Sequence, residues 1–104
     1  MATTRRYCVI GNEGYGLYCG YVSATYEEIA KAGAVSVEEC RHIRYWYGGT
    51  GGITSLAAWG PCGKRAVESR IGAPCPSSLI MQVRAVHECT PEAMSSFALI
   101  VASR

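Results

Sequence analysis

The residues best suited to bind a ligand lie together in residues 41–52, which read RHIRYWYGGTGG. A guanidinium pairs with phosphate or carboxylate through two parallel hydrogen bonds, and aromatic rings stack on a flat ring such as a base. A glycine-rich turn lets backbone N–H groups approach an anion at the start of a helix. The segment therefore predicts a site for a small nucleotide-like anion, lined by Arg41, Arg44, Tyr45, Trp46, Tyr47, Gly48, Gly49, Thr50 and Gly51.

Each of these features also has a structural interpretation. Tyr and Trp are strand formers that pack beneath helices, and for Trp46 taken alone packing in the core is the favoured interpretation. Arginines on an exposed strand are often solvated, and glycine-rich turns are often only turns. The binding hypothesis therefore requires that guanidinium, indole and backbone amides converge on one pocket.

Catalytic and metal-binding patterns are weaker. The glycines of residues 48–52 are not followed by Lys-Ser or Lys-Thr, so a phosphate-binding P-loop is rejected. A zinc set of Cys62, Cys75, His87 and Cys89 has the spacing of no common zinc module, so we expect neither a metal nor a cofactor. A hydrolase or transferase that uses Cys40 or Cys89 with His42 or His87 remains the third class of function, behind two non-enzymatic ones.

Length and composition predict one globular domain over residues 1–104, with 49% hydrophobic and 17% charged residues. The formal net charge of +2 is too small to favour duplex nucleic acid as a partner. The first residues lack the apolar stretch of a signal peptide, and the longest apolar run, residues 97–102, is too short to span a bilayer. We therefore expect an intracellular, soluble protein without a membrane partner.

The elements that must position the candidate site follow from periodicity and turn residues. We expect a β-hairpin within residues 5–25, where two glycines on one face of the second strand predict a bulge or a close packing partner. A short helix over 26–33 precedes a third strand that starts at Val35, is interrupted at 38–40 and resumes over 41–47. A helix over 53–60, a loop over 62–76 and one strand over 78–87 come next.

The sequence of residues 90–92, Thr-Pro-Glu, predicts the start of a C-terminal helix, with Thr90 as N-cap and Pro91 in its first turn. Its apolar stripe consists of Ala93, Met94, Phe97, Ala98 and Val101. The sum is an α+β domain with four to five mostly antiparallel strands, a short mid-chain helix and a C-terminal helix packed on the sheet.

The central segment resembles a family of small tailed-phage proteins that carry a domain of unknown function. The resemblance lies in Arg-x-Ile-x-Tyr-Trp-x-Gly-Gly, in the helix sequence Ile-Thr-Ser-Leu-Ala over residues 53–57 and in Gly60. The opening hairpin (6–22) and residues 83–92 are similar more weakly. The longer glycine turn, residues 26–33, which resemble an insertion, and the loop over 62–76 depart from the family's pattern. The resemblance transfers no catalytic residue.

What the resemblance implies is an accessory protein of a bacteriophage or prophage, made in the host bacterial cytoplasm. Combined with the candidate site, it predicts a counter-defence or host-takeover protein that sequesters a nucleotide-like ligand, such as a cyclic nucleotide of bacterial immune signalling, without cleaving it. We expect a homo-oligomer, because a small domain encloses a ligand better with a neighbouring copy. The alternative is a minor virion structural or protein-interaction module, in which the Tyr, Trp and Arg side chains form an interface hot spot.

Overall fold

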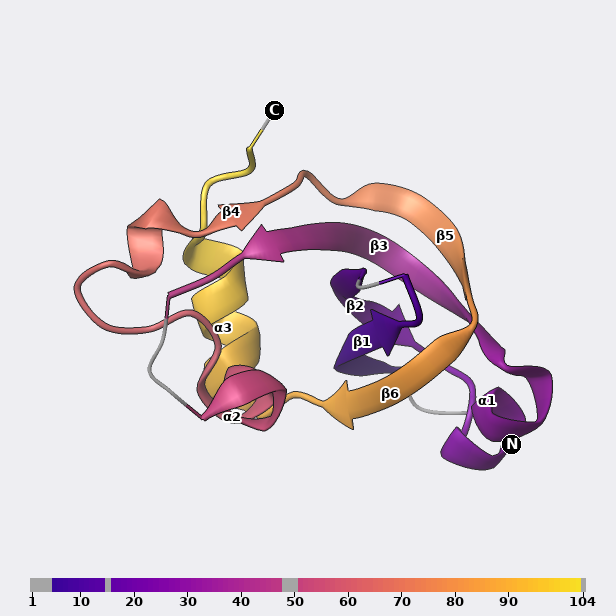
Figure 1. Ribbon diagram of the computed structural model, residues 1–104. Helices are drawn as coiled ribbons and strands as arrows, with labels where there is room; N and C mark the ends of the chain where they lie inside the picture. Colours follow the sequence, from indigo (N-terminus) through magenta and orange to yellow (C-terminus); the bar gives the residue numbers. More distant parts are fainter. Residues whose placement is uncertain (1–4, 15, 48–50, 104) are drawn as a thin grey trace.

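The structure is a computed structural model, which describes residues 5–14, 16–47 and 51–103. Its strands form a curled antiparallel sheet, with α2 and α3 packed on one side and α1 at the opposite end (Figure 1). In chain order the elements are β1 (Arg6–Asn12), β2 (Leu17–Val22), α1 (Tyr26–Ala32), β3 (Ala34–Tyr45), α2 (Gly52–Trp59), the 3-10 helix η1 (Ala66–Glu68), β4 (Arg70–Ile71), β5 (Cys75–Met81), β6 (Val83–Glu88) and α3 (Pro91–Leu99).

The hairpin expected at the start of the chain is formed by β1 and β2. The strand order is β4-β3-β2-β1-β6, and β5 pairs with β3 on the same edge as β4. The predicted α+β class with a mostly antiparallel sheet is therefore confirmed.

The single strand expected over residues 78–87 is wrong. The segment bends at Gln82, whose φ of 53° is a left-handed conformation that interrupts a strand. Its first half, β5, pairs with β3, and its second half, β6, pairs with β1. Alternation along the sequence continues through the bend, so periodicity alone could not reveal it. The bend is what curls the sheet upon itself.

Two hydrophobic clusters lie on the two faces of the curled sheet. We call the cluster inside the curl the inner core, and it consists of Cys8, Ile10, Val22, Ile29, Val35, Val37, Cys40 and Ile80. The outer core lies between the sheet and the helices α2 and α3, and consists of Val9, Cys19, Ile43, Leu56, Ala57, Ile71, Phe97 and Ile100. Consecutive residues of β1 belong to different clusters, so this strand is buried on both faces.

The expected interruption of the third strand is a local shift within one continuous strand, β3. Glu39 has a φ of 52°, and the side chains that face the inner core are Val35 and Val37 before it and Cys40 after it. The register between β2 and β3 shifts at the same place, opposite Gly20. A Cβ on Gly20 would lie 2.5 Å from the Val37 Cγ1 atom, which confirms the close packing partner predicted for the glycine face.

The helices begin and end at the residues that the sequence indicates. Thr25 and Glu28 form a capping box at the start of α1, and Gly33 ends it with a φ of 68°. Thr90 caps α3 by accepting a hydrogen bond from the Ala93 N–H. Of the stripe predicted for α3, Ala93 and Phe97 are buried, whereas the other three members are exposed.

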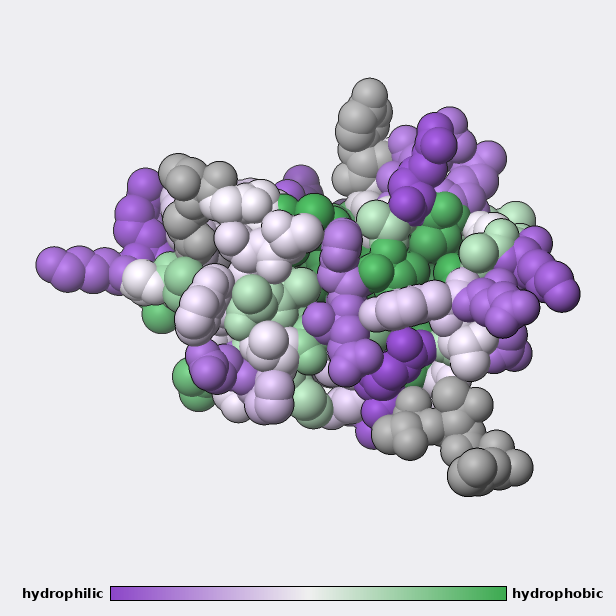
Figure 2. Space-filling model, turned by 90° about the horizontal axis from the view of Figure 1, so that it is seen from below, coloured by the Kyte–Doolittle hydropathy of each residue, from purple (hydrophilic) through white to green (hydrophobic). Residues whose placement is uncertain are grey.

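Two further features complete the surface. The loop expected over residues 62–76 contains the short strand β4 and the beginning of β5, so that prediction is wrong in part. Seen from below, hydrophobic surface gathers between hydrophilic side chains (Figure 2). A shallow cavity of about 230 Å³ between α1 and β6 has Ile29, Val83 and Val86 in its lining. In the part of the chain that the structure describes, no helix is long and apolar enough to cross a bilayer.

Candidate functional site

Arg41 and Arg44 lie on opposite faces of β3, because side chains alternate along a strand and the two positions differ by an odd number. Arg41 is 7% exposed and points toward α3. Its Nε donates to the Gly72 carbonyl at 2.7 Å, and its two terminal nitrogens donate to the Phe97 and Ile100 carbonyls at 2.8 and 3.0 Å. Arg41 therefore satisfies main-chain carbonyls at the end of a helix and does not share a pocket with Arg44, which corrects the single-pocket expectation.

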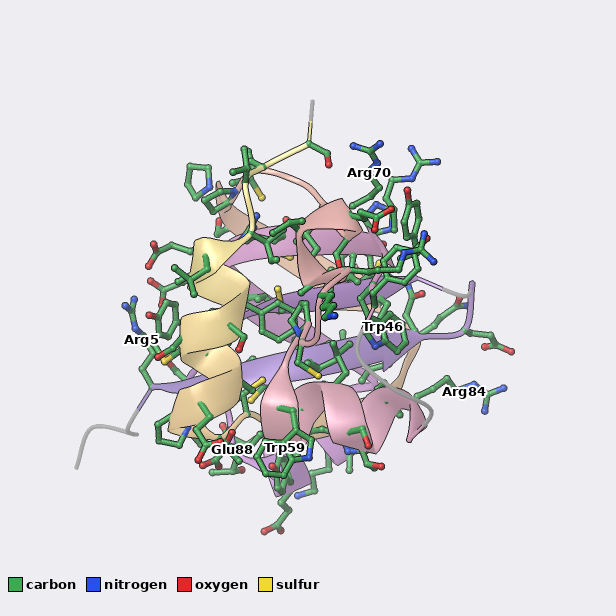
Figure 3. The ribbon with its side chains drawn as sticks, turned by 90° about the vertical axis from the view of Figure 1, so that its left-hand side faces the viewer. Arg5, Trp46, Trp59, Arg70, Arg84 and Glu88 are labelled. Atoms are coloured by element: carbon green, nitrogen blue, oxygen red, sulfur yellow. The ribbon has the colours of Figure 1, made fainter. Side chains whose placement is uncertain are left out.

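Trp46 is also separated from Arg44. The strand ends at Tyr45, and from there the chain turns so that the partly buried Trp46 packs against the outer core rather than continuing the face of His42 and Arg44. Figure 3 shows Trp46 near α2, away from Arg70. Trp46 therefore packs against the core, as the structural interpretation of this residue predicts.

Tyr47 and the glycine turn complete the predicted set. The backbone N–H of Tyr47 donates to the Ser69 hydroxyl, and the Arg65 guanidinium lies 4.1 Å from the centroid of the Tyr47 ring. Gly48, Gly49 and Thr50 lie outside the described residues. Gly51 is exposed and precedes the first residue of α2. The contribution of the turn to a ligand site therefore stays a prediction.

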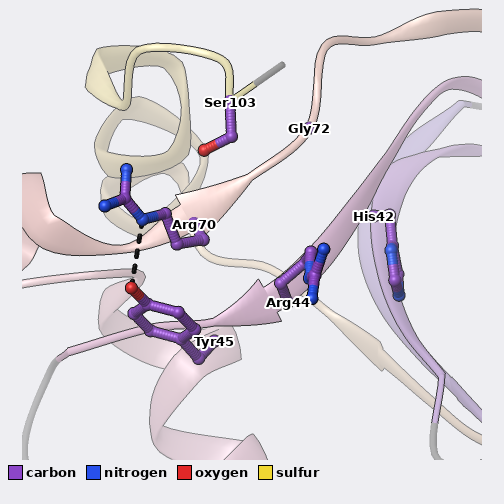
Figure 4. A pocket seen from close by; sticks show the side chains of 6 residues that line it. All are labelled: His42, Arg44, Tyr45, Arg70, Gly72 and Ser103. Atoms are coloured by element: carbon purple, nitrogen blue, oxygen red, sulfur yellow. Dashed lines mark hydrogen bonds between the residues drawn. The ribbon is translucent and has the colours of Figure 1, made fainter.

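Arg44 and Tyr45 line an open pocket of about 450 Å³ together with residues that come from elsewhere in the chain (Figure 4). The short strand β4 pairs with the end of β3, so that Arg70 lies opposite Tyr45. The Gly72 N–H donates to the His42 carbonyl, and the Ser103 N–H donates to the Ile71 carbonyl. Among the described residues, the lining consists of His42, Arg44, Tyr45, Arg70, Gly72 and Ser103.

The pocket carries two cations and an aromatic ring held in place. The Arg70 Nε donates to the Tyr45 hydroxyl at 3.0 Å, drawn as the dashed line in Figure 4. The Tyr45 ring is 44% exposed and meets the Tyr47 ring edge-on at a centroid distance of 5.9 Å. Within residues 5–14, 16–47 and 51–103, neither Arg44 nor Arg70 lies within ion-pair distance of a carboxylate. The pocket can therefore offer guanidinium donors to an anion.

Arg65, which lies next to the pocket, does have a carboxylate partner. Arg65 is exposed and forms an ion pair with Glu68, with the Arg65 Nε atom 2.8 Å from a carboxylate oxygen. This contact lowers the pKa of the Glu68 carboxyl through the hydrogen bond from Arg65. Because its charge is already matched, Arg65 is a weaker anion donor than Arg44 and Arg70. The pocket thus has two arginines without a carboxylate at ion-pair distance among the described residues, beside the Arg65–Glu68 pair, although the charge of Arg70 also contributes to lowering the pKa of Glu68.

Sequence reasoning missed four members of the lining: His42, Arg70, Gly72 and Ser103. The sequence offers His42 only as an alternative catalytic partner of a cysteine. Arg70 and Gly72 lie in a segment expected to be a loop, and Ser103 lies beyond the predicted helix. The only available signal was the brief Arg-Ile-Gly sequence of residues 70–72, which marks the short strand.

The cysteines give little support to thiol chemistry at this site. Burial raises the pKa of the Cys89 thiol to about 12 and also raises the pKa of the Cys40 thiol. Both shifts disfavour the thiolate, which is the nucleophilic form. In the described part of the chain, no group of three His, Cys, Asp or Glu side chains lies close enough together to hold a metal ion.

Comparison with known families supplies the identity of the domain. The model of the DUF6948 family, a domain of unknown function, matches residues 5–97. The chain belongs to this family. The match spans all six strands and reaches into α3, so it includes every residue of the pocket lining except Ser103. No curated protein and no solved structure matches the chain.

Proposed function

We propose that this protein binds a nucleotide-like anion, without catalysis, in the pocket between β3 and β4. The observation that carries the proposal is that Arg44 and Arg70, which have no carboxylate within ion-pair distance among the described residues, line one pocket together with the exposed Tyr45 side chain. Two guanidinium groups suit a phosphate that bears more than one oxygen acceptor, and the tyrosine ring offers a stacking surface for a base. A volume of about 450 Å³ lies within the usual range for small-molecule sites.

The proposed ligand-binding residues differ from the initial set. Arg44 and Tyr45 remain, whereas Arg70 takes the role first given to Arg41. His42 and Ser103 add polar groups to the lining of the pocket. The chain offers these donors on strands anchored by the outer core, since Ile43 and Ile71 neighbour them and are buried there. Binding would therefore need no large rearrangement of the backbone.

The biological role that we propose is that of a bacteriophage accessory protein in the host cytoplasm. Supporting it are the resemblance to small tailed-phage proteins and a pocket that has anion donors but no activated nucleophile among the described residues. Such a protein would act against host defence by sequestering a nucleotide signal. The pocket is open, so we further propose a homo-oligomer in which a neighbouring copy covers the bound ligand.

The experiment is a binding series with matched arginine variants. Wild-type protein, Arg44→Ala, Arg70→Ala and the control Arg84→Ala are titrated by calorimetry with cyclic dinucleotides, cyclic trinucleotides, mononucleotides and inorganic phosphate. Arg84 is exposed, is paired with Glu13 and lies far from Arg70 in Figure 3, so its removal should not affect binding.

We expect at least one nucleotide to bind wild-type protein, with affinity that falls as salt is added and falls at least about tenfold in each pocket variant, equivalent to about 1.4 kcal/mol. Two results would refute the proposal: no nucleotide binds, or Arg44→Ala and Arg70→Ala bind as tightly as Arg84→Ala.

A second candidate function, a minor virion or protein-interaction module, is favoured by the Trp59 side chain on α2. This tryptophan is 57% exposed, and exposed tryptophans are over-represented among interface hot spots. Mass spectrometry of purified virions separates the two functions, because a structural component is present at a stoichiometric copy number and a sequestering protein is not.

A further inference from the structure

Cys40 and Cys75 face each other directly across the β3–β5 ladder. Five consecutive pairs, from Ala34 opposite Met81 to Glu38 opposite Ser77, precede this pair, and the same register resumes at Cys40 after Glu39. Directly opposed residues of an antiparallel ladder have Cα atoms about 4.5 or 5.5 Å apart, and both values lie within the range of about 4.4–6.8 Å that disulfides span. Among the strand registers of the described residues, this is the only cysteine opposite a cysteine.

The side chains of the two cysteines also converge. The Cys75 sulfur lies 3.1 Å from the Ser78 hydroxyl oxygen. Burial raises the pKa of the Cys40 thiol, and the Ser78 hydroxyl, which lowers this pKa, and the Cys75 thiol, which raises it, also act on Cys40, so both side chains lie close to it. The backbone register and the side-chain contacts therefore point to the same pair independently.

The accessibility of the two thiols is unequal. Cys75 is exposed at the start of β5, whereas Cys40 is 5% exposed and belongs to the inner core. A small oxidant can reach Cys75 directly, and Cys40 then needs only to reach its neighbour. Cys62 is exposed as well, but it lies in the loop after α2, outside the strand ladders.

We propose that Cys40 and Cys75 form a reversible redox site that takes low-molecular-weight disulfides, such as glutathione disulfide, as its oxidant. The Cys75 thiolate attacks one sulfur of the oxidant, which releases one small thiol and leaves a mixed disulfide on Cys75. The Cys40 thiol then gives up its proton as its sulfur attacks the Cys75 sulfur, and the second small thiol is released. The two protein thiols are oxidised to one disulfide, and the oxidant is reduced to two small thiols. The two protons lost by Cys40 and Cys75 balance those taken up by the released thiolates.

The disulfide would join β5 to β3 at the base of the segment that carries the ligand pocket. Both chain ends of that segment leave the ladder at Cys40 and Cys75, and it contains α2, η1 and β4. A cross-link there removes conformational freedom from the unfolded chain, so the oxidised protein should be more resistant to heat. This proposal does not rest on ligand binding at the pocket.

The experiment is oxidation followed by peptide mapping without reduction. Wild-type protein is incubated with glutathione disulfide, its remaining thiols are blocked, and it is digested with trypsin. Cleavage after Lys31, Arg41, Arg70 and Arg84 places Cys40 in residues 32–41 and Cys75 in residues 71–84, whereas the other four cysteines fall in other peptides. We expect one cross-linked pair, residues 32–41 joined to 71–84, which dithiothreitol separates.

Thermal denaturation gives a second measurement. Oxidation should raise the Tm of wild-type protein by roughly 10 °C, and dithiothreitol should reverse the rise. The exposed-cysteine variants Cys75→Ser and Cys62→Ser avoid disturbing the core: the first should lose both the cross-link and the rise in Tm, and the second should keep both. The proposal is overturned if Cys75 stops at the mixed disulfide, if the cross-links scatter among other cysteines, or if Cys75→Ser gains the same rise.

Discussion

Replacement of Arg41 by alanine should destabilise the fold without acting through ligand binding. The side chain crosses the outer-core side of the sheet and donates to three main-chain carbonyls, those of Gly72, Phe97 and Ile100. Two of these carbonyls belong to the last turn and the C-cap of α3, where carbonyls lack the regular helical N–H partner four residues on; that of Phe97 accepts one further hydrogen bond, from the Ile100 N–H. The guanidinium also complements the negative end of the helix dipole.

The size of the effect follows from the number and type of these bonds. A hydrogen bond to a charged group contributes about 1.5–3 kcal/mol, so three of them amount to roughly 4–9 kcal/mol. Removal of the buried cation recovers several kcal/mol of desolvation free energy. The cavity of about 350 Å³ beside Arg41 lets water reach part of the vacated space. We therefore expect Arg41→Ala to lower the free energy of unfolding by about 3–5 kcal/mol, a fall in Tm of at least about 12 °C.

Urea denaturation of Arg41→Ala, Arg41→Lys and the control Arg44→Ala measures this directly. Lysine supplies one cationic donor without the planar fork, so Arg41→Lys should be intermediate. Arg44 is exposed on the other face of the same strand, and its removal should change the free energy of unfolding by less than about 0.5 kcal/mol. If Arg41→Ala costs less than about 1 kcal/mol, or no more than Arg44→Ala, the structural role assigned to Arg41 is refuted.

Two other predictions concern the sheet and its thiols. Gly20→Ala should lower the free energy of unfolding by about 1–3 kcal/mol or more, because the new methyl group would collide with Val37. Gly11→Ala is the matched control, since the nearest atoms to its new Cβ would be 3.8 Å away or farther. Equal urea midpoints for both variants would count against the close packing at Gly20. Stability should also fall above about pH 9, because burial raises the pKa of four thiols and the unfolded chain therefore loses their protons first. Each group then lowers the free energy of unfolding by up to about 1.4 kcal/mol per pH unit. These thiols are Cys8 and Cys19, with pKa values of about 11, Cys89, with a pKa of about 12, and Cys40, whose pKa is also raised. Urea midpoints that do not change between pH 8 and 10 would contradict this assignment.

Local signals predicted the fold well where one short-range interaction decides the structure. The N-cap of α3 and the turn of the first hairpin depend on residues within a few positions of one another, and both were predicted. The capping box of α1, formed by Thr25 and Glu28, is equally local but was not predicted. The bend at Gln82 was missed because its flanking residues keep the alternation of a single strand. What divides β5 from β6 is their pairing with β3 and β1, far away in sequence. Such pairing leaves no local pattern.

The candidate site shows the same limit in a sharper form. Successive side chains of a strand point to opposite faces of the sheet. The candidate residues of 41–47 are therefore divided between the outer-core side of the sheet and the open pocket. Arg41 goes to the end of α3, and Arg44 goes to the open pocket. The second cation of that pocket, Arg70, comes from a two-residue strand whose position is fixed by the pairing of Ile71 with Ile43. Burial of these two isoleucines in the outer core therefore positions the donors of the pocket, and a change of register between β3 and β4 would abolish the site while leaving all of its residues in the sequence.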